Sequence, residues 1–574
     1  MKKTILLFTS FLFILPSIFS QSATVGDAQT KSKQIDALMK HCHEFGMFNG
    51  AILVSEKGNV IYRNAFGNAN KEKGEKLKPE SAFYLASVSK QFTTMAIMIL
   101  KERGKLSFSD PLSKYFPAFP DYADKVTIRH LMTHTSGVPD HYRLNLYRTD
   151  LKNSDVLERL IKQDTLDFTP GERYSYSNGG FVMLAMIAEK AAGMPFHTFM
   201  KENIFDPLGM KHTLVFDESK PKIPNRAIGY NQAGELDDYE ILTSGAGGMF
   251  SNVDDLYLWD QALYTEKLVS NETLEEAFKP TILNNGDVSD YGYGWGITID
   301  GDKKVVAHSG SLGGYRTFLR RDLSSRNAHM ILTNNGGALA MGPINTAIEN
   351  ILAGEKYELP KIPFASKLRE LMQENEAPVA AQLANDFLEA QSDKYDSDEQ
   401  GVNTLGYDYL GKNDYSKALA VFQLNIDLNP TSANTYDSMG EAYMKSGDTA
   451  NAIKLYKKSV ELNPNNTNGI QMLADMGVNT DDLIQKVEIP TEVLDSYVGK
   501  YELLPGFVLT ILREGDKMMI HPTGQSVSEI FPSSQTRFYS KIVDAQLTFN
   551  VDSDGKVSSL TLHQGGDTIA QRIE

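Results

Sequence analysis

The sequence predicts a mixed α/β (α+β) chain in which three regions differ in their local pattern. Apolar residues recur at helical spacing after Ser87, a 34-residue repeat occupies residues 396–480, and strand-like segments fill residues 490–574. The 574-residue length is ample for several hydrophobic cores. We therefore expect a multidomain protein whose stability comes from the burial of apolar surface.

The N-terminus has the pattern of a secretory signal peptide. Lys2 and Lys3 form a charged start, residues 5–18 are largely apolar, and small residues lie around Ser20. We expect cleavage after Ser20, so that residues 1–20 are removed and the mature chain is exported, either periplasmic or secreted. The apolar stretch is too short for a comfortable transmembrane helix, and no cysteine lies at the cut, so no stable membrane anchor is expected. An uncleaved anchor is the alternative.

Charge and cysteine content exclude several kinds of partner. The formal net charge is −16, and loss of the two lysines of the signal makes it −18. Such an acidic protein has no general attraction to nucleic acid, so no nucleic-acid partner is expected. The single cysteine, Cys42, excludes an internal disulfide. His41 and His43 flank it, but residues two apart do not share a helix face, and no metal or other cofactor is expected.

Ser87 lies in a Ser-x-x-Lys string that opens an amphipathic helix. Positions three apart share a helix face, so Lys90 is expected within reach of the Ser87 hydroxyl. A serine hydroxyl is a poor nucleophile until a nearby base takes its proton. Gly104 follows Lys101-Glu102-Arg103 and is the expected stop signal of the helix. The string therefore predicts an activated serine.

Similar strings elsewhere in the chain lack this local context. The Ser-x-x-Lys string at Ser219 contains Pro221, which disfavours a regular helix. The string at Ser553 includes Gly555 and lies in a predicted hairpin turn. His134, in a Thr-His-Thr-Ser-Gly segment, is expected to be a hydrogen-bonded structural residue of a loop. Only Ser87 has the helical setting that the chemistry requires.

Two further motifs follow Ser87 along the chain. Tyr176-Ser177-Asn178 lies after a Pro-Gly turn and before a helix expected from about residue 181 to residue 192. His308-Ser309-Gly310 follows a predicted strand at residues 305–307 and precedes Ser311. Single copies of each motif also occur elsewhere by chance. The ordered conjunction of three motifs, each in suitable local structure, is the specific signal.

Together these motifs resemble those of the serine β-lactamase and penicillin-binding-protein family, in its class C and D-alanyl-D-alanine carboxypeptidase branch. Other stretches are similar to segments of that family: residues 131–137, 207–210, 245–249 and 291–296. The resemblance covers about residues 30–355 and implies a β-lactamase-like serine hydrolase domain there. It implies a mostly antiparallel sheet flanked by helices, together with a helical subdomain.

The resemblance also implies a role for each catalytic residue. Ser87 would be the nucleophile that forms an acyl-enzyme, and Lys90 and Tyr176 would share the proton transfers. A nearby lysine cation favours tyrosinate, so we expect the pKa of Tyr176 to lie below its usual value of ~10. Asn178 would bind the substrate amide and the Lys90 ammonium group.

The strand after these motifs would supply the substrate-binding residues His308, Gly310 and Ser311. The backbone N–H groups of Ser87 and Ser311 would form the oxyanion hole. Many members of the family carry Lys-Thr-Gly at this place, and that lysine helps to recognise a substrate carboxylate. A histidine is mostly neutral at pH 7, which argues against efficient β-lactam turnover. Ester, amide and D-amino-acid peptide substrates stay open.

Residues 396–480 contain the 34-residue repeat. The equivalent pairs are Leu405-Gly406 and Met439-Gly440, Tyr409 and Tyr443, Ala418 and Ala452, Phe422 and Tyr456, and Pro430 and Pro464. The period and pattern resemble tetratricopeptide repeats. Two repeats are few, so we expect the helical segment at residues 367–391, within a helical linker at 356–395, to add a stacking partner. The concave face would bind a protein or peptide partner, and a rigid spacer is the alternative.

Residues 490–574 change to strand patterning. Residues 508–512 and 517–520 read as a hairpin, and residues 545–551 and 557–563 flank a turn at Asp554-Gly555. This pattern predicts a small antiparallel β-barrel-like domain, similar to a lipocalin-like module. It contains no catalytic constellation.

We therefore expect an exported serine hydrolase that acts through an acyl-enzyme on an amide or ester. The candidate substrates are a D-amino-acid peptide, a β-lactam and a carboxylester. The alternative is a non-catalytic penicillin-binding-like protein that acts as a binding or scaffold module through its helical repeats. The intact set of Ser87, Lys90, Tyr176 and Asn178 favours the enzyme, because a binding protein has no need of it.

Overall fold

The computed structural model of the chain separates into two compact units, residues 1–362 and 363–574. The structure describes residues 25–231, 234–238, 241–336, 341–480, 489–504, 507–515, 517–523, 526–532, 534–540, 545–551, 556–563 and 567–573. The expected signal peptide and the turn at Asp554-Gly555 lie outside the described residues. In the part of the chain that is described, no helix has both the length and the apolar character needed to cross a membrane.

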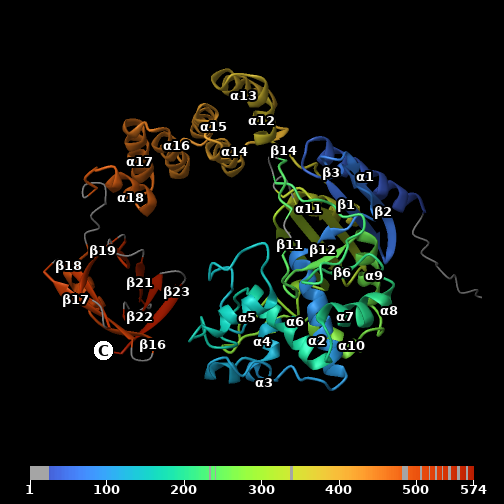
Figure 1. The fold of residues 1–574 in the computed structure, drawn as a ribbon. Coiled ribbons are helices and arrows are strands. Elements are labelled where there is room, and N and C mark those ends of the chain that lie inside the picture. Colours follow the sequence, from blue (N-terminus) through green and yellow to red (C-terminus); the bar gives the residue numbers. More distant parts are fainter. Residues whose placement is uncertain are drawn as a thin grey trace, which may run out of the picture. The chain divides into compact units, whose positions relative to one another are not determined.

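The first unit is built on a six-stranded antiparallel sheet (Figure 1). Its strands, in spatial order, are β10 (Gly296–Asp300), β11 (Lys303–Leu312), β12 (Tyr315–Asp322), β13 (Asn327–Thr333), β1 (Gly50–Glu56) and β2 (Asn59–Phe66). β1 pairs with β13 from Gly50 opposite Thr333 to Ser55 opposite Ala328. This pairing joins the beginning and the end of the unit into one sheet.

Helices cover both faces of this sheet. Ile52 and Val54 of β1 lie in one core cluster with α1 (Val25–Glu44) and α11 (Met341–Ala353). Ala51 and Leu53 lie in a second, larger cluster, because successive strand residues point to opposite faces. That cluster includes residues of α2 (Lys90–Glu102), α6 (Asn178–Ala192) and α9 (Val253–Ala262). The result is a helix–sheet–helix arrangement, as the fold class predicted.

Short elements complete the first unit. The helical ones are η1 (Ala86–Ser89), α3 (Leu112–Tyr115), η2 (Asp121–Asp124), α4 (Ile128–Met132), α5 (Asn153–Ile161), α7 (Phe196–Met200), η3 (Lys201–Phe205), α8 (Asp206–Leu208) and α10 (Asn271–Ala277). The strands are β3 (Asn68–Asn70), β4 (Glu75–Lys76), β5 (Phe83–Tyr84), β6 (Leu214–Val215), β7 (Met249–Ser251), β8 (Thr281–Ile282) and β9 (Val288–Ser289). β5, β7 and β6 form a small sheet of their own.

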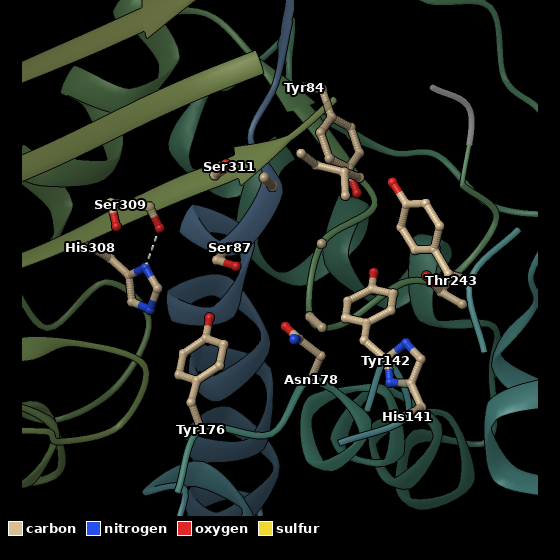
Figure 2. Close-up of a pocket in the computed structure, with 15 residues that line it drawn as sticks. Tyr84, Ser87, His141, Tyr142, Tyr176, Asn178, Thr243, His308, Ser309 and Ser311 are labelled. Atoms are coloured by element: carbon tan, nitrogen blue, oxygen red, sulfur yellow. Dashed lines mark hydrogen bonds between the residues drawn. The ribbon is translucent and has the colours of Figure 1, made fainter. Parts of the chain in front are cut away.

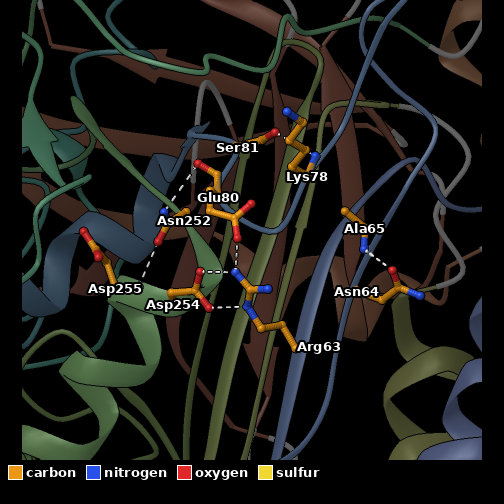
Figure 3. A network of polar contacts seen from close by, with 9 residues as sticks. All are labelled: Arg63, Asn64, Ala65, Lys78, Glu80, Ser81, Asn252, Asp254 and Asp255. Atoms are coloured by element: carbon orange, nitrogen blue, oxygen red, sulfur yellow. Dashed lines mark hydrogen bonds and ion pairs between the residues drawn. The ribbon is translucent and has the colours of Figure 1, made fainter.

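A charged network on the surface connects three of these segments (Figure 3). Arg63 of β2 donates from Nε to Asp254 Oδ1 at 2.5 Å and from Nη2 to Asp254 Oδ2 at 2.6 Å. The same guanidinium donates to Glu80, which precedes β5. Asn252 accepts from the backbone N–H of Asp255 at 2.8 Å and so caps the start of α9. The network holds the edge strand β2 against α9 and the approach to β5.

The second unit begins with packed helix pairs. These are α12 (Phe364–Glu374), α13 (Ala377–Gln391), α14 (Glu399–Gly411), α15 (Tyr415–Leu428), α16 (Ala433–Ser446), α17 (Thr449–Leu462) and α18 (Thr467–Asp475), with short strands β14 (Ile362–Pro363) and β15 (Tyr395–Asp396). A Cβ on Gly406 would lie 2.3 Å from the Phe422 ring, and one on Gly440 would lie 3.2 Å from the Tyr456 ring. The repeated small and aromatic positions are therefore contacts between the paired helices. α12 and α13 share a core cluster with α14 and α15, as expected of a stacking partner.

The chain ends in a closed antiparallel barrel, which confirms the predicted β-barrel-like domain. After α19 (Thr491–Tyr497), its strands are β16 (Gly499–Leu504), β17 (Phe507–Glu514), β18 (Lys517–Pro522), β19 (Ser528–Pro532), β20 (Arg537–Ser540), β21 (Gln546–Val551), β22 (Val557–His563) and β23 (Asp567–Arg572). The rings of Tyr497 and Phe549 stack with centroids 4.2 Å apart. Aromatic and aliphatic side chains form the core of this domain.

Two boundaries differ from the sequence-based expectation. α6 begins at Asn178 instead of about residue 181, because the Ser177 hydroxyl accepts from the Gly180 N–H and caps the helix earlier. His308-Ser309-Gly310 lies within β11 instead of after it, because pairing with β12 continues to Leu312. The predicted end of α2 before Gly104 is confirmed.

Candidate active site

Ser87 lies in the 3-10 helix η1, which joins β5 to α2 (Figure 2). The helix predicted to open at Ser87 is therefore a 3-10 helix there and becomes α-helical at Lys90. The preceding residue, Ala86, has a φ of 47°, in the left-handed region that residues with a Cβ rarely adopt. Such a backbone costs about 1–3 kcal/mol and persists only where the surroundings hold it. Leu85 supplies part of that hold, because its N–H donates to Met249 O at 2.8 Å. The turn presents the half-buried Ser87 to a cavity.

Lys90 lies beneath Ser87 and is fully buried. Its Nζ is 3.1 Å from Ser87 Oγ, 2.8 Å from Asn178 Oδ1 and 2.9 Å from the carbonyl oxygen of Ala246. Burial lowers the pKa of Lys90 to about 7, and the Asp140 carboxylate acts in the opposite direction. Near neutral pH the Lys90 side chain is therefore divided between ammonium and amine.

The partners of Lys90 determine what the neutral amine can do. A neutral amine has two N–H donors and one lone pair. Two of its three partners, Asn178 Oδ1 and Ala246 O, are carbonyl oxygens that can only accept. When both donors are used there, the lone pair is left for the hydroxyl hydrogen of Ser87. This is the geometry of a general base beside its nucleophile.

Tyr176 points its hydroxyl toward Ser87 (Figure 2). Burial raises the pKa of Tyr176 above its usual value, the hydrogen bond with Ser87 acts in the opposite direction, and Tyr174 and Asp140 raise it further. The expectation that the pKa of Tyr176 lies below ~10 is therefore wrong. Desolvation of the phenolate outweighs any cation effect, and the lysine expected to stabilise it is itself only partly charged near neutral pH. Tyr176 is a phenol that can relay a proton, and Lys90 is the stronger candidate for the base.

Asn178 is oriented by an acidic residue that the sequence analysis did not single out. Asp140 Oδ2 accepts from the Asn178 backbone N–H at 2.5 Å and from Asn178 Nδ2 at 3.0 Å. A carboxylate can only accept, so the amide must present its Oδ1 to Lys90. The predicted contact between Asn178 and Lys90 is present. No recognisable sequence motif surrounds Asp140 that could have indicated this role.

His134 packs against the ring of Tyr176 and hydrogen-bonds to the backbone next to it. Its Nδ1 lies 3.1 Å from the Ser177 backbone nitrogen, which donates to it, and its ring centroid is 4.2 Å from that of Tyr176. Burial holds the pKa of His134 well below its ordinary value, so the ring is neutral. The structural role expected for His134 agrees with these contacts.

Gly310 allows β11 to approach the Ser87 turn closely. A Cβ at position 310 would lie 2.2 Å from the carbonyl oxygen of Leu85 and 3.1 Å from the backbone nitrogen of Ser87. Only glycine leaves room for this approach. Ser311 follows on the same strand and lines the cavity with Ser309. The backbone of β11 therefore lies close to the backbone nitrogen of Ser87, as an oxyanion hole formed by these two segments requires.

His308 is held at both ring nitrogens by the protein. Nδ1 is 2.6 Å from the carbonyl oxygen of Ser309 and Nε2 is 2.9 Å from the hydroxyl of Tyr291. Because a carbonyl can only accept, Nδ1 carries the hydrogen and Tyr291 donates to Nε2. Burial, with the nearby Lys90, lowers the pKa of His308 to about 4. His308 is therefore neutral, and a direct bond to substrate would require one of these two contacts to break.

The cavity above Ser87 has a volume of about 440 Å³. Its lining residues are Tyr84, Ala86, Ser87, His141, Tyr142, Tyr147, Tyr176, Asn178, Thr243, Ala246, Gly247, His308, Ser309, Ser311 and Leu312. The three motifs therefore meet in one cavity. Tyr142, Tyr147 and His141 were missed, because they come from a loop without a recognisable motif, and Tyr84 was missed on the short strand β5. Among the described residues no group of three or more His, Cys, Asp or Glu side chains is placed to hold a metal ion.

Three families match successive parts of the chain. The family described as "Beta-lactamase" matches residues 33–351. The "Tetratricopeptide repeat" family matches residues 433–466. A "Domain of unknown function (DUF3471)" matches residues 484–572, the region of the barrel.

Similar proteins are known by sequence and by structure. "Penicillin-binding protein 4*" of Bacillus subtilis is 35% identical over 366 residues, which are 60% of this chain and 81% of that protein. The octameric penicillin-binding protein homologue of Pyrococcus abyssi is 20% identical with a TM-score of 0.51, over 94% of this chain and 99% of that one. "EstCE1, a hydrolase with promiscuous acyltransferase activity" is 23% identical with a TM-score of 0.50, over 57% and 100% of the two chains. These two structures show similarity of fold.

Proposed function

We propose that this chain, which belongs to the beta-lactamase family, is a serine hydrolase that works through an acyl-enzyme on Ser87. The observation that carries the proposal is the 3.1 Å separation of Lys90 Nζ from Ser87 Oγ at a fully buried lysine. Burial makes the amine available near neutral pH, which is what a general base requires.

The first step forms the acyl-enzyme. The Ser87 oxygen attacks the scissile carbonyl of an ester or amide while its proton passes to Nζ of Lys90. The new oxyanion lies between the backbone N–H groups of Ser87 and Ser311. One such donor contributes about 2.7–4 kcal/mol to transition-state stabilisation.

The leaving group then departs with a proton. The Tyr176 hydroxyl points toward Ser87, and the ring centroids of Tyr176 and His308 are 6.4 Å apart. Tyr176 gives its proton to the departing oxygen or nitrogen and is reprotonated from Lys90. In the second half of the reaction, water takes the place of the leaving group and the same proton transfers run in the opposite direction. This step releases the acid and restores Ser87.

The substrate classes that we propose are an ester, an amide or peptide of a D-amino acid, and a β-lactam. Export to the periplasm or the medium is part of the proposal, since the N-terminal sequence has the signal pattern. The helical repeats, of which residues 433–466 match the tetratricopeptide family, are proposed to bind a protein or peptide partner.

A covalent probe tests the proposed nucleophile. Intact mass is measured after incubation with a fluorophosphonate, for the wild type and for Ser87→Ala. We expect one adduct on the wild type and none on Ser87→Ala. Ser219→Ala is the matched control, because Ser219 lies in another Ser-x-x-Lys string and is exposed, and it should keep the adduct. A well-folded wild type without an adduct would overturn the proposal and favour the binding role.

A further inference from the structure

We propose that the helical repeats bind a cationic peptide segment, rich in lysine or arginine, along one face of α14, α16 and α18. The proposal rests on the proposed function, in which the repeats bind a protein or peptide partner, and it names the chemistry of that partner. The occupant is a segment of another protein whose ammonium or guanidinium groups meet carboxylates of the repeats.

The first helices of successive helix pairs lie side by side (Figure 1). The Tyr407 hydroxyl of α14 donates to Glu441 Oε2 of α16 at 2.9 Å. Asn468 of α18 donates from Nδ2 to Asp437 Oδ2 of α16 at 3.1 Å. Polar side chains therefore join these three helices across one face.

This face carries two rows of polar residues at matching positions of the repeat. Residues 34 apart occupy equivalent places in stacked repeats, and residues four apart on one helix share a face. We define the repeat face by these two rows, Asn403, Asp437 and Gln471 in the first row and Tyr407, Glu441 and Asp475 in the second. Three of these six residues are acidic and none is basic. A segment that crosses the helices therefore meets carboxylates on both α16 and α18.

The sign of the charge differs between the two layers of helices. α14, α16 and α18 contain five Asp or Glu residues and one Lys, whereas α15 and α17 contain two Asp or Glu residues and four Lys. The net charge of −16 of the whole chain would by itself make both layers acidic. The negative charge of the repeats is instead concentrated in the layer that carries the repeat face, which favours a cationic ligand there.

Two carboxylates of the repeat face are held by neutral amide groups. Asp437 accepts from Asn466 Nδ2 at 2.6 Å and from Asn468 Nδ2 at 3.1 Å. Asp475 accepts from Gln471 Nε2 at 2.8 Å. Within the parts of the chain that the structure describes, neither carboxylate has a lysine or arginine partner. Amide donors leave the negative charge uncompensated and some lone pairs unused, so both carboxylates can accept from a ligand cation.

Glu441 places a second negative charge close to Asp437, since residues four apart on a helix are neighbours. Burial raises the pKa of Asp437, Asn466 and Asn468 act in the opposite direction, and Glu441 raises it further. Lys445 Nζ lies 2.8 Å from Glu441 Oε1, but this lysine is exposed, and such a surface pair contributes little. A ligand cation between Asp437 and Glu441 would reduce the repulsion between them.

Asn403 adds a buried acceptor to the repeat face. Its side chain is 5% exposed, and among the described residues no donor reaches its Oδ1. Buried polar atoms in folded proteins generally have a hydrogen-bond partner, so this atom points to a donor from a ligand. Asn403 lies one turn before Tyr407, on the side of α14 whose hydroxyl reaches α16. The open positions of the repeat face are thus acceptors, which match the N–H donors of lysine and arginine.

The experiment compares three fluorescent peptides of equal length by anisotropy. One alternates lysine with glycine, the second has glutamine in place of each lysine, and the third has glutamate there. The protein is the full chain with Ser87→Ala, so that the Ser87 site cannot process a peptide. We expect the lysine peptide to bind about tenfold or more tighter than the glutamine peptide, and added salt to reduce the difference. Equal binding, or tighter binding of the glutamine or glutamate peptide, would overturn the proposal.

Matched charge variants locate the binding. Asp437→Asn with Glu441→Gln removes two charges from the repeat face and should weaken binding of the lysine peptide about fivefold or more. Asp427→Asn with Glu461→Gln removes the same charge from exposed positions of α15 and α17, and should weaken it less than about twofold. Asp475→Asn, at an exposed position of α18, should weaken binding about twofold and serves if the first variant does not fold. If the face and control variants weaken binding equally, the peptide follows the overall charge and the proposal fails.

The proposal and the function on which it rests fail in different ways. If the glutamine or glutamate peptide binds better than the lysine peptide, the repeats bind peptides and only the preference for a cation is wrong. If none of the three peptides binds, the peptide-binding role of the repeats is wrong as well, and the rigid spacer remains. Acylation of Ser87 is tested separately by the fluorophosphonate adduct.

Discussion

The Nζ atom of Lys90 lies 3.1 Å from the Oγ atom of Ser87, and its other two partners are carbonyl oxygens. Our proposal that Lys90 is the proton acceptor rests on this count of hydrogen-bond donors and acceptors, and it does not depend on resemblance. Tyr176 is excluded as a ready-made base, because burial raises its pKa. The pair therefore turns a sequence motif into a specific order of proton transfers.

The first prediction concerns pH. Below the pKa of Lys90, which is about 7, the amine is protonated and has no lone pair for the Ser87 proton. We expect kcat/KM to rise tenfold per pH unit below this value and to level off above it. The measurement is the pH profile of kcat/KM for a neutral ester between pH 5 and pH 9, since ionisation of the substrate then plays no part. A flat profile across this range would show that Lys90 is not the base.

The second prediction concerns Tyr176. Tyr176→Phe removes the hydroxyl that relays the proton but keeps the ring that packs against His134. We expect kcat to fall by about 10²–10⁴ with little change in the unfolding temperature. Tyr174→Phe is the matched control and should stay near wild-type activity, since Tyr174 is not followed by an asparagine two residues later. Full activity in Tyr176→Phe would mean that the proton takes another route.

The third prediction concerns the close approach at Gly310. In Gly310→Ala the new methyl group would lie 2.2 Å from the backbone oxygen of Leu85, so β11 and the Ser87 turn must move apart. A misplacement of this size in an oxyanion hole costs about 10²-fold or more in acylation rate. The rate of fluorophosphonate labelling measures this loss of acylation rate. Gly342→Ala, at a helical glycine with open space around it, should label like the wild type.

The fourth prediction concerns the network in Figure 3. Arg63→Ala leaves Asp254 and Glu80 without their shared cation. The side chains are about a third exposed or more, so solvent screening limits the effect to about 1 kcal/mol. We expect a lower unfolding temperature by about 1–3 °C at low salt and a smaller loss at high salt. Lys162→Ala removes an exposed ion pair with Glu158 and should lower the unfolding temperature less.

Local patterns were enough for much of the fold. The 34-residue period identifies the paired helices, because the glycine and aromatic positions must meet within each pair. The end of α2 before Gly104 follows from local signals in the same way. The start of α6 and the extent of β11 were missed, because a side-chain cap and a partner strand decided them. Such contacts are weakly marked in the sequence.

The sequence by itself determined that three motifs share the site, since Ser87 and Lys90 are one helical turn apart and the other two motifs occur in order. The loop residues around them, such as Asp140 and His141, came only from the structure. Only the tertiary structure decided their protonation states. The pKa of Lys90 falls to about 7 because segments distant in the sequence bury it, and His308 stays neutral because it is buried and Tyr291 and the strand backbone occupy both of its nitrogens. Desolvation and hydrogen-bond partners are properties of the assembled fold, and they set the chemistry that the motif makes available.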